Sequence, residues 1–334
     1  MTRPPDQERR LTVARKILAD VNPERWVERG SSLLSIDRAR QLAIASGASV
    51  DLFVCDSAGS MADGVLFDNE SVASARIEYM QELQNWLESQ AAPLREEGGE
   101  VRCHVEWHSP RYEAILAKAR EVEADLIVRA ARSHGRIDRL FFGATDWELI
   151  RRAPQLLWLC KKVLDPLSSG LRVLAAVDPS HPEEKKAGLD RKLVEVGGSI
   201  VEFFGGSLHL FHAYRPGVMV APIASATHQG AVPVMRLSSE LAGELEKHRK
   251  AELRKLSESA GISDDHVHLV AGNTSEALEE LVMQLEIDVV VAGAVSRGRI
   301  ERLLIGSTAE AILDDVHCDV VIVKPDGFPD KRLL

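Results

Sequence analysis

Apolar residues along this chain follow two alternating patterns. Short runs rich in Val, Leu, Ile and Ala are typical of buried strands, and longer segments with apolar residues every three to four positions are typical of amphipathic helices. In the first half, strands are predicted over residues 16–22, 50–55, 101–107, 125–131 and 156–160. Helices are predicted between them over residues 33–46, 71–97 and 112–122, and from about residue 145. This alternation predicts a parallel sheet covered by helices.

The second half repeats the same order of elements. Its predicted strands are residues 172–177, 208–214, 267–270, 288–293 and 319–324. Its predicted helices are residues 189–204, 238–259 and 275–285, with a last helix from about residue 308. Residues 215–239 are the least regular stretch and are predicted to form a loop, because three prolines interrupt them.

A long internal repeat accompanies this pattern. SHGRIDRLFFGAT (residues 133–145) reappears 163 residues later as SRGRIERLLIGST (residues 296–308), with eight of the thirteen positions identical. A repeat of this length predicts two domains of one fold rather than a solenoid of short units. We expect a first domain over residues 1–164 and a second over residues 171–334, joined by a linker rich in turn-forming residues.

Composition narrows the classes of function. The net charge is −10, which argues against direct binding to nucleic acid or to an anionic membrane surface, because both need a basic face. The sequence has no apolar run long enough to cross a membrane, and its N-terminus lacks the apolar stretch of a signal peptide. Four cysteines without CxxC spacing are expected to be free, buried thiols. We therefore expect a cytoplasmic protein.

The second copy of the repeat carries residues suited to a phosphate. Gly293 ends the predicted fourth strand, and Gly298 lies in the loop that follows. Backbone N–H groups and the positive end of a helix make such a loop an anion site. The remaining candidates are Arg297, Gly306, Ser307 and Thr308, which offer positive charge, backbone N–H groups and hydroxyls. A tight turn with a helix capping box, Ser307-x-x-Glu310, is the alternative interpretation of the same residues.

The first copy has a weaker case for phosphate. Ala130 and Ala144 stand where the second copy has Gly293 and Ser307. Asp146 places a carboxylate in the first turn of the following helix, where it compensates the helix dipole and would repel a phosphate. The two copies are therefore predicted to differ in chemistry.

These residues resemble the universal stress protein superfamily, whose nucleotide-binding members carry Gly-x2-Gly-x9-Gly-Ser/Thr after strand four. The second half reads Gly293-x2-Ser296-x9-Gly306-Ser307, so Ser296 departs from the motif. The family also places an Asp at the end of strand one and a main-chain contact to the base on strand two. Asp178 and Ala213 match these two positions.

The resemblance covers nearly the whole chain and is greatest to the tandem E group of the family. It implies two fused Rossmann-like domains of the adenine nucleotide alpha hydrolase-like type, each a five-stranded parallel sheet flanked by helices. It also implies an internal pseudo-dimer, a homodimer of whole chains, further protein partners, and a role in survival of stress, including DNA-damaging agents. The expected ligand is ATP with Mg²⁺, bound in the second domain.

Other functions remain open from the residues alone. The clefts and the segment 215–239 would suit a binding module for a different, for example amphipathic, ligand. A slow nucleotide hydrolase is the third interpretation, although no pair of sequence neighbours forms a catalytic set, and we expect a non-catalytic protein. His104 and His108 share a face of the third predicted strand, but they lie too far apart for easy joint ligation of a metal.

Overall fold

The protein is described by a computed structural model that covers residues 14–22, 33–56, 69–133, 140–141, 143–179, 184–214, 231–294 and 316–328. The elements of the N-terminal half are β1 (Lys16–Asp20), α1 (Leu34–Ser46), β2 (Ser49–Asp56), α2 (Asn69–Glu96), β3 (Val101–Trp107), α3 (Arg111–Glu121), β4 (Leu126–Ala130), β5 (Arg132–Ser133), β6 (Leu140–Phe141), α4 (Ala144–Arg152) and β7 (Leu156–Cys160). After the short α5 (Pro166–Ser169), the C-terminal half contains β8 (Leu171–Ala176), α6 (Glu184–Phe204), β9 (Gly206–Tyr214), α7 (Ala231–Ser259), η3 (Asp264–His266), β10 (Val267–Ala271), α8 (Thr274–Gln284), β11 (Val289–Gly293) and β12 (Asp319–Val323).

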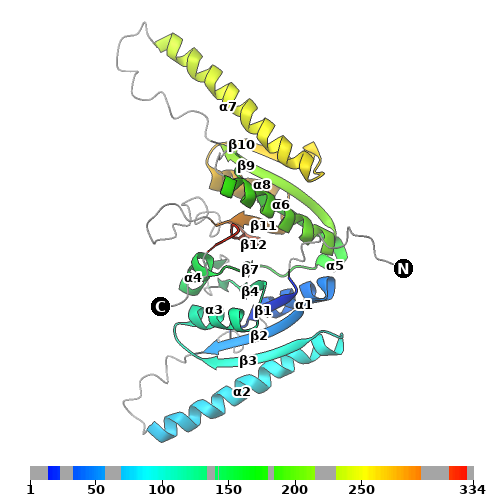
Figure 1. Cartoon of the computed structure of the whole chain (residues 1–334), viewed down its shortest axis with the longest axis vertical. Helices are drawn as coiled ribbons and strands as arrows, with labels where there is room; N and C mark the ends of the chain where they lie inside the picture. The colour runs from blue at the N-terminus through cyan, green and yellow to red at the C-terminus, as the bar shows by residue number, and fades with distance from the viewer. Residues whose placement is uncertain are drawn as a thin grey trace, which may run out of the picture.

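Ten strands form one continuous sheet, in the order β10-β9-β8-β11-β12-β7-β4-β1-β2-β3. Five neighbouring strands come from each half, and within each half all pairs are parallel. The halves meet where β12 pairs antiparallel with β7. Figure 1 shows the sheet running through the whole molecule, with the long helices α7 and α2 at its two ends.

The strands of the two halves pair in the same register. Ile17 lies beside Leu126 in the first half, and Val173 lies beside Val289 in the second. Residues of β1 and β4 therefore correspond to residues 156 and 163 positions later, and the loop sequence repeats at the same 163-residue spacing. This register gives every strand position in one half a defined counterpart in the other.

Helices cover both faces of the sheet. One core, which contains Leu42, Leu87 and Ile200, lies between the sheet and helices α1, α2, α6 and α7. The other core contains Ile115 and Leu278 and lies under α3, α4 and α8. Both cores include residues from both halves, so apolar burial holds the halves together as well as folding each one.

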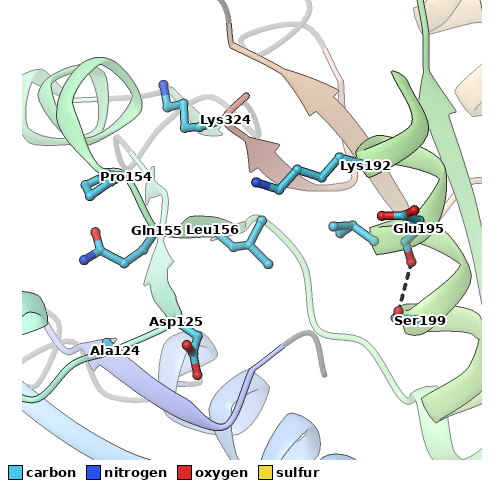
Figure 2. A pocket seen from close by; sticks show the side chains of 10 residues that line it. Ala124, Asp125, Pro154, Gln155, Leu156, Lys192, Glu195, Ser199 and Lys324 are labelled. Carbon is cyan, nitrogen blue, oxygen red and sulfur yellow. Dashed lines mark hydrogen bonds between the residues drawn. The ribbon is translucent and has the colours of Figure 1, made fainter. Parts of the chain in front are cut away.

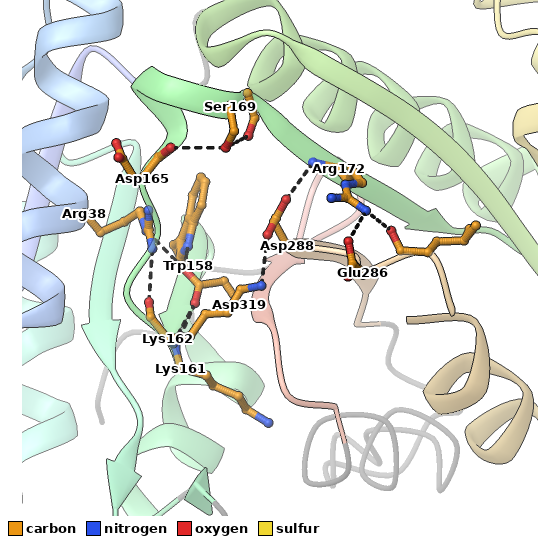
Figure 3. Close-up of polar contacts among 12 residues, drawn as sticks. Arg38, Trp158, Lys161, Lys162, Asp165, Ser169, Arg172, Glu286, Asp288 and Asp319 are labelled. Carbon is orange, nitrogen blue, oxygen red and sulfur yellow. Dashed lines mark hydrogen bonds and ion pairs between the residues drawn. The ribbon is translucent and has the colours of Figure 1, made fainter. Parts of the chain in front are cut away.

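The junction between the halves also contains buried polar contacts (Figure 3). Asp319, at the start of β12, is fully buried and accepts hydrogen bonds from Arg38 Nε at 3.0 Å and Trp158 Nε1 at 2.8 Å. The backbone N–H of Lys161 donates to the same carboxylate at 2.8 Å. A buried carboxylate is stable only with such partners, so this cluster fixes how β7 and β12 sit against each other.

Most predicted elements are confirmed to within a few residues at their ends. The prediction of a loop over residues 215–239 is wrong in part, because residues 231–239 belong to α7. The small antiparallel pair β5 and β6 was not predicted, since two-residue strands leave no periodic signal. No helix among the described residues is long and apolar enough to cross a membrane.

Candidate functional site

The carboxyl ends of β8, β9 and β11 meet at one edge of the C-terminal half. Asp178 follows β8, Ala213 lies near the end of β9, and Gly293 ends β11. Because β8 pairs with both β9 and β11, these three predicted site residues come from neighbouring strands. Ligands of open α/β sheets bind in the crevice outside this edge. The other predicted residues, Ser296, Arg297, Gly298, Gly306, Ser307 and Thr308, lie outside the described residues.

Two further titratable groups lie against Asp178. The carboxylate of Asp190, on α6, accepts a hydrogen bond from the backbone N–H of Asp178 at 3.0 Å. The ring of His212, on β9, lies 3.9 Å from the Asp178 carboxylate and donates to the carbonyl of Val177 at 3.0 Å. Asp190 and His212 are buried, whereas the Asp178 side chain is 51% exposed. Asp178 is therefore the acidic group of this cluster that a ligand can reach.

Burial raises the pKa of Asp190 to about 6, and the neighbouring charge of Asp178 acts in the same direction. The hydrogen bond from the Asp178 N–H opposes this shift only in part. Asp190 was not predicted from the sequence, because an Asp in the second turn of a helix is ordinary for a solvated helix. Its raised pKa marks the cluster as a candidate functional site.

Gly293 has a packing role at the end of β11. A Cβ atom at this position would lie 2.7 Å from Cδ2 of Leu189, on α6. The backbone of Gly293 does not have a positive φ, so the glycine is not required for a turn. The close approach of α6 to the sheet is sufficient to favour glycine here, whatever the loop beyond it binds.

The corresponding crevice of the N-terminal half is filled by its own charged side chains. Arg129, on β4, donates to Asp20 at the end of β1 and to Asp146 in the first turn of α4. Arg111, at the start of α3, donates to Asp20 at 2.9 Å. The other oxygen of Asp146 accepts from the backbone N–H of Gly143 at 2.7 Å, at the N-terminus of α4. A carboxylate of the chain thus occupies the helix end where a phosphate would bind.

These charges stabilise one another. Burial raises the pKa of Asp20, but Arg111 and Arg129 outweigh it and hold the pKa below its ordinary value. Burial lowers the pKa of Arg129, and the two carboxylates outweigh it and raise that pKa. Asp20, Arg129 and Asp146 are each at most 2% exposed. Each of these buried charges is thus paired with an opposite charge of the chain itself.

The C-terminal half replaces every member of this network by a small or uncharged residue. The shared register places Ala176 beside Ala292, where the first half has Asp20 beside Arg129. Thr274 starts α8 as Arg111 starts α3, and Ala309 stands in the sequence where the first half has Asp146. Of these network residues, only Asp146 was predicted from the sequence to affect the binding of a phosphate. The signal for Asp20 and Arg129 was a charged residue in an apolar strand of one copy and an alanine in the other.

The histidines form contacts that were not predicted. His209 Nδ1 lies 3.1 Å from His268 Nε2, and the ring of His266 lies 4.2 Å from the ring of His209. His104 lies 2.7 Å from the carboxylate of Asp51. Among the described residues, no three His, Cys, Asp or Glu side chains are placed to hold a metal ion together.

Two halves of one sheet, each with five parallel strands whose carboxyl ends meet at one edge, define a tandem Rossmann-like α/β protein. The profile described as "Universal stress protein family" matches residues 30–161 and again residues 171–324. The chain belongs to the universal stress protein family, with two copies of the family's domain. Membership of this family supports a role in the stress response.

Related proteins agree with this assignment. The chain is 29% identical to universal stress protein E of Escherichia coli K12 over 244 residues, which are 73% of this chain and 74% of that protein. It is 27% identical to universal stress protein E of Photorhabdus laumondii over 247 residues, 73% of this chain and 75% of that protein. A putative universal stress protein from Pseudomonas aeruginosa has the same fold, with a TM-score of 0.70 and 23% identity over 94% of each chain.

Proposed function

We propose that this chain is a cytoplasmic stress-response protein that acts by binding rather than by catalysis. Its C-terminal half binds ATP, with Mg²⁺, or a related nucleotide in the crevice at the ends of β8, β9 and β11. Its N-terminal half binds none. Survival of stress, including DNA-damaging agents, then depends on partner proteins that recognise the chain, alone or as a homodimer, in its nucleotide-bound state.

The observation that carries this proposal is the exchange of charged for small residues between the two crevices. Asp20, Arg129 and Arg111 close the first crevice, and Ala176, Ala292 and Thr274 stand in their places in the second. An Ala side chain leaves space and removes the buried carboxylates that would repel a phosphate. The second crevice thus lacks the internal ion-pair network that closes the first.

Named residues of the C-terminal half support the choice of a nucleotide. The exposed carboxylate of Asp178 would accept hydrogen bonds from a base or a ribose. Ala213 offers main-chain groups near the end of β9. The loop residues Ser296, Arg297, Gly298, Gly306, Ser307 and Thr308 would supply backbone N–H groups, hydroxyls and positive charge to the phosphates.

The test is nucleotide binding by the purified full-length chain. Mass spectrometry of the small molecules released on denaturation, and a rise in melting temperature with added ATP and Mg²⁺, are the expected results. The double variant A176D/A292R, which places the first-half pair in the second crevice, should abolish both signals while remaining folded. Asn22→Asp adds the strand-one carboxylate to the closed crevice, and the stoichiometry should stay at one nucleotide per chain.

The proposal fails if no nucleotide copurifies and added ATP leaves the melting temperature unchanged. ATP turnover is measured in parallel, in the native chain and in Gly306→Val. Turnover abolished by Gly306→Val would assign a hydrolase activity to this site and contradict the non-catalytic role.

A further inference from the structure

A cavity of about 360 Å³ lies between the two halves, on the face of the sheet that α6 covers. Figure 2 shows residues of α6 on one side of it and residues that precede β4 and β7 on the other. Its volume is within the range of small-molecule sites, roughly 300–1,000 Å³. The lining residues that matter for its chemistry are Asp125, Leu156, Lys192, Glu195, Val196 and Lys324.

The related position on the other side of the junction is filled by two long cationic side chains. There Arg38, on α1, reaches Asp319, and Lys162 Nζ lies 2.9 Å from the carboxylate of Asp288 (Figure 3). The register that relates the two halves assigns a counterpart to each of these positions at the cavity. Asp319 corresponds to Leu156 by strand register, and Lys162 and Pro325 each lie two residues after the end of β7 or β12. Arg38 corresponds to Val196, because each lies nine residues before the glycine that ends α1 or α6. The cavity is therefore the space that a guanidinium and an ammonium occupy on the opposite side.

The cavity retains the acidic residue of the Lys162–Asp288 ion pair, as Asp125, but has no lysine at the position of Lys162. Asp125 accepts hydrogen bonds from the backbone N–H groups of Arg15 and Lys16, at 2.8 and 3.0 Å. Its counterpart Asp288 accepts from the N–H of Arg172 at 2.9 Å and also binds Lys162. Asp125 makes the same backbone contact and is exposed to the cavity.

The other charged groups of the lining leave the cavity acidic. The Glu195 side chain is exposed at its rim, and Lys192 is already paired with Asp326 at 2.8 Å. Lys324 is buried and donates to the carbonyl of Ile150, at the end of α4. Burial lowers the pKa of Lys324 to about 7, so its positive charge is only partial near neutral pH.

We propose that this cavity binds a small organic cation with an amino or guanidinium group. Its charged end pairs with Asp125 as Lys162 pairs with Asp288, and its aliphatic part packs against Leu156 and Val196. Diamines and guanidino compounds of about the length of an arginine side chain have this chemistry. The site is separate from the proposed nucleotide crevice, and its ligand is of opposite charge.

The test uses agmatine and putrescine as probes, with glycerol 3-phosphate as the anionic probe, in calorimetric titrations of the full-length chain at low salt. Agmatine should bind with one site per chain, and Asp125→Asn should weaken it at least tenfold. Asp288→Asn, the matched change across the junction, should leave the affinity unchanged. Pro325→Lys supplies the missing ammonium from the chain itself and should abolish agmatine binding while raising the melting temperature.

Three results would overturn the proposal. The first is no heat with agmatine or putrescine up to millimolar concentration in a folded sample. The second is equal affinity in the native chain and in Asp125→Asn. The third is binding of glycerol 3-phosphate that Lys324→Met abolishes, which would assign the cavity to anions.

Discussion

The two crevices of this molecule have the same strand register and opposite contents. In the first half, Arg129 holds Asp20 and Asp146 together and the crevice is closed by ion pairs. In the second half, Ala176 and Ala292 occupy the paired positions, so this ion-pair network is missing there. The difference shows that one fold can hold a buried charge network in one copy and lack it in the other.

The largest expected effect comes from breaking the network of the closed crevice. Arg129→Leu leaves Asp20 and Asp146 buried without their shared partner, which costs about 3–5 kcal/mol of unfolding free energy. Denaturant unfolding of the native and variant chains measures this difference. The control is Arg102→Leu, which removes an exposed ion pair with Glu100 and should cost less than about 1 kcal/mol. Equal losses in the two variants would show that the network contributes no more than a surface pair.

The second prediction concerns Asp190, beside the open crevice, where the first half has Ser32 in the sequence. The pKa of Asp190 is raised from 3.8 to about 6, so the folded chain holds this proton more tightly than the unfolded chain. The free energy of unfolding should therefore fall as the pH rises between these two values, by about 2–3 kcal/mol. Asp190→Asn should remove this fall and be more stable than the native chain at pH 7.5. Thermal unfolding across the pH range measures both, and a variant that is less stable at pH 7.5 would contradict the prediction.

The third prediction compares the outer strands of the two halves. His209 contacts His268 in the second half, and the shared register puts the contact of Asp51 with His104 at the same place in the first. Burial, with the nearby His266 and His268, lowers the pKa of His209 to about 4. Stability should therefore be lost as the pH falls from about 6.5 towards 4, by about 1–2 kcal/mol after the full shift is discounted for screening by solvent next to the edge strand.

His209→Asp tests this comparison, because it restores the acid–histidine pair of the first half. The variant should lose less stability than the native chain between pH 6.5 and pH 5, as measured by its melting temperature. The matched change in the first half, Asp51→His, should make the chain more sensitive to acid. Parallel pH profiles for all three proteins would exclude a role for these pairs.

The smallest expected effect is at Gly293. Gly293→Ala gives the second half the residue that the first half has at the corresponding position, Ala130. The added Cβ atom would contact Leu189. The far end of a leucine side chain can move, so the cost should be about 1 kcal/mol or less. Leu189→Ala in the same chain should relieve the contact, which a double-mutant cycle measures. Additive effects of the two changes would show that the contact does not explain the glycine.

The fold was predictable from the sequence because its signals are local. Apolar runs gave the strands, and Gly47 and Gly205 end α1 and α6 in the left-handed conformation that glycine favours. The duplication could be recognised from the sequence because the loop sequence repeats. The start of α7 was missed because Pro233, in its first turn, is also a turn signal.

The candidate site was predictable only where one residue type carries the signal. Asp178 was found by the resemblance to the family, which places an Asp at the end of strand one, and Asp146 by its place in a first helical turn. The contact of Arg129 with Asp20 joins residues 109 positions apart, and the contact of Arg38 with Asp319 joins residues 281 positions apart. No local pattern reports such pairs. A position-by-position comparison of the two copies would have found the first pair, because the second copy has alanines at the positions of these two charged residues.

The antiparallel pairing of β7 with β12 has a consequence for how the halves can evolve. Two separate chains that met through these strands would dissociate on dilution and would also form pairs of identical copies. Because one polypeptide carries both, the pairing is intramolecular and its strength does not depend on protein concentration. Each molecule then contains one copy of each kind in a fixed ratio of one to one. Under that arrangement one half can give up a ligand site while the other keeps it, and no molecule is ever assembled with two closed crevices.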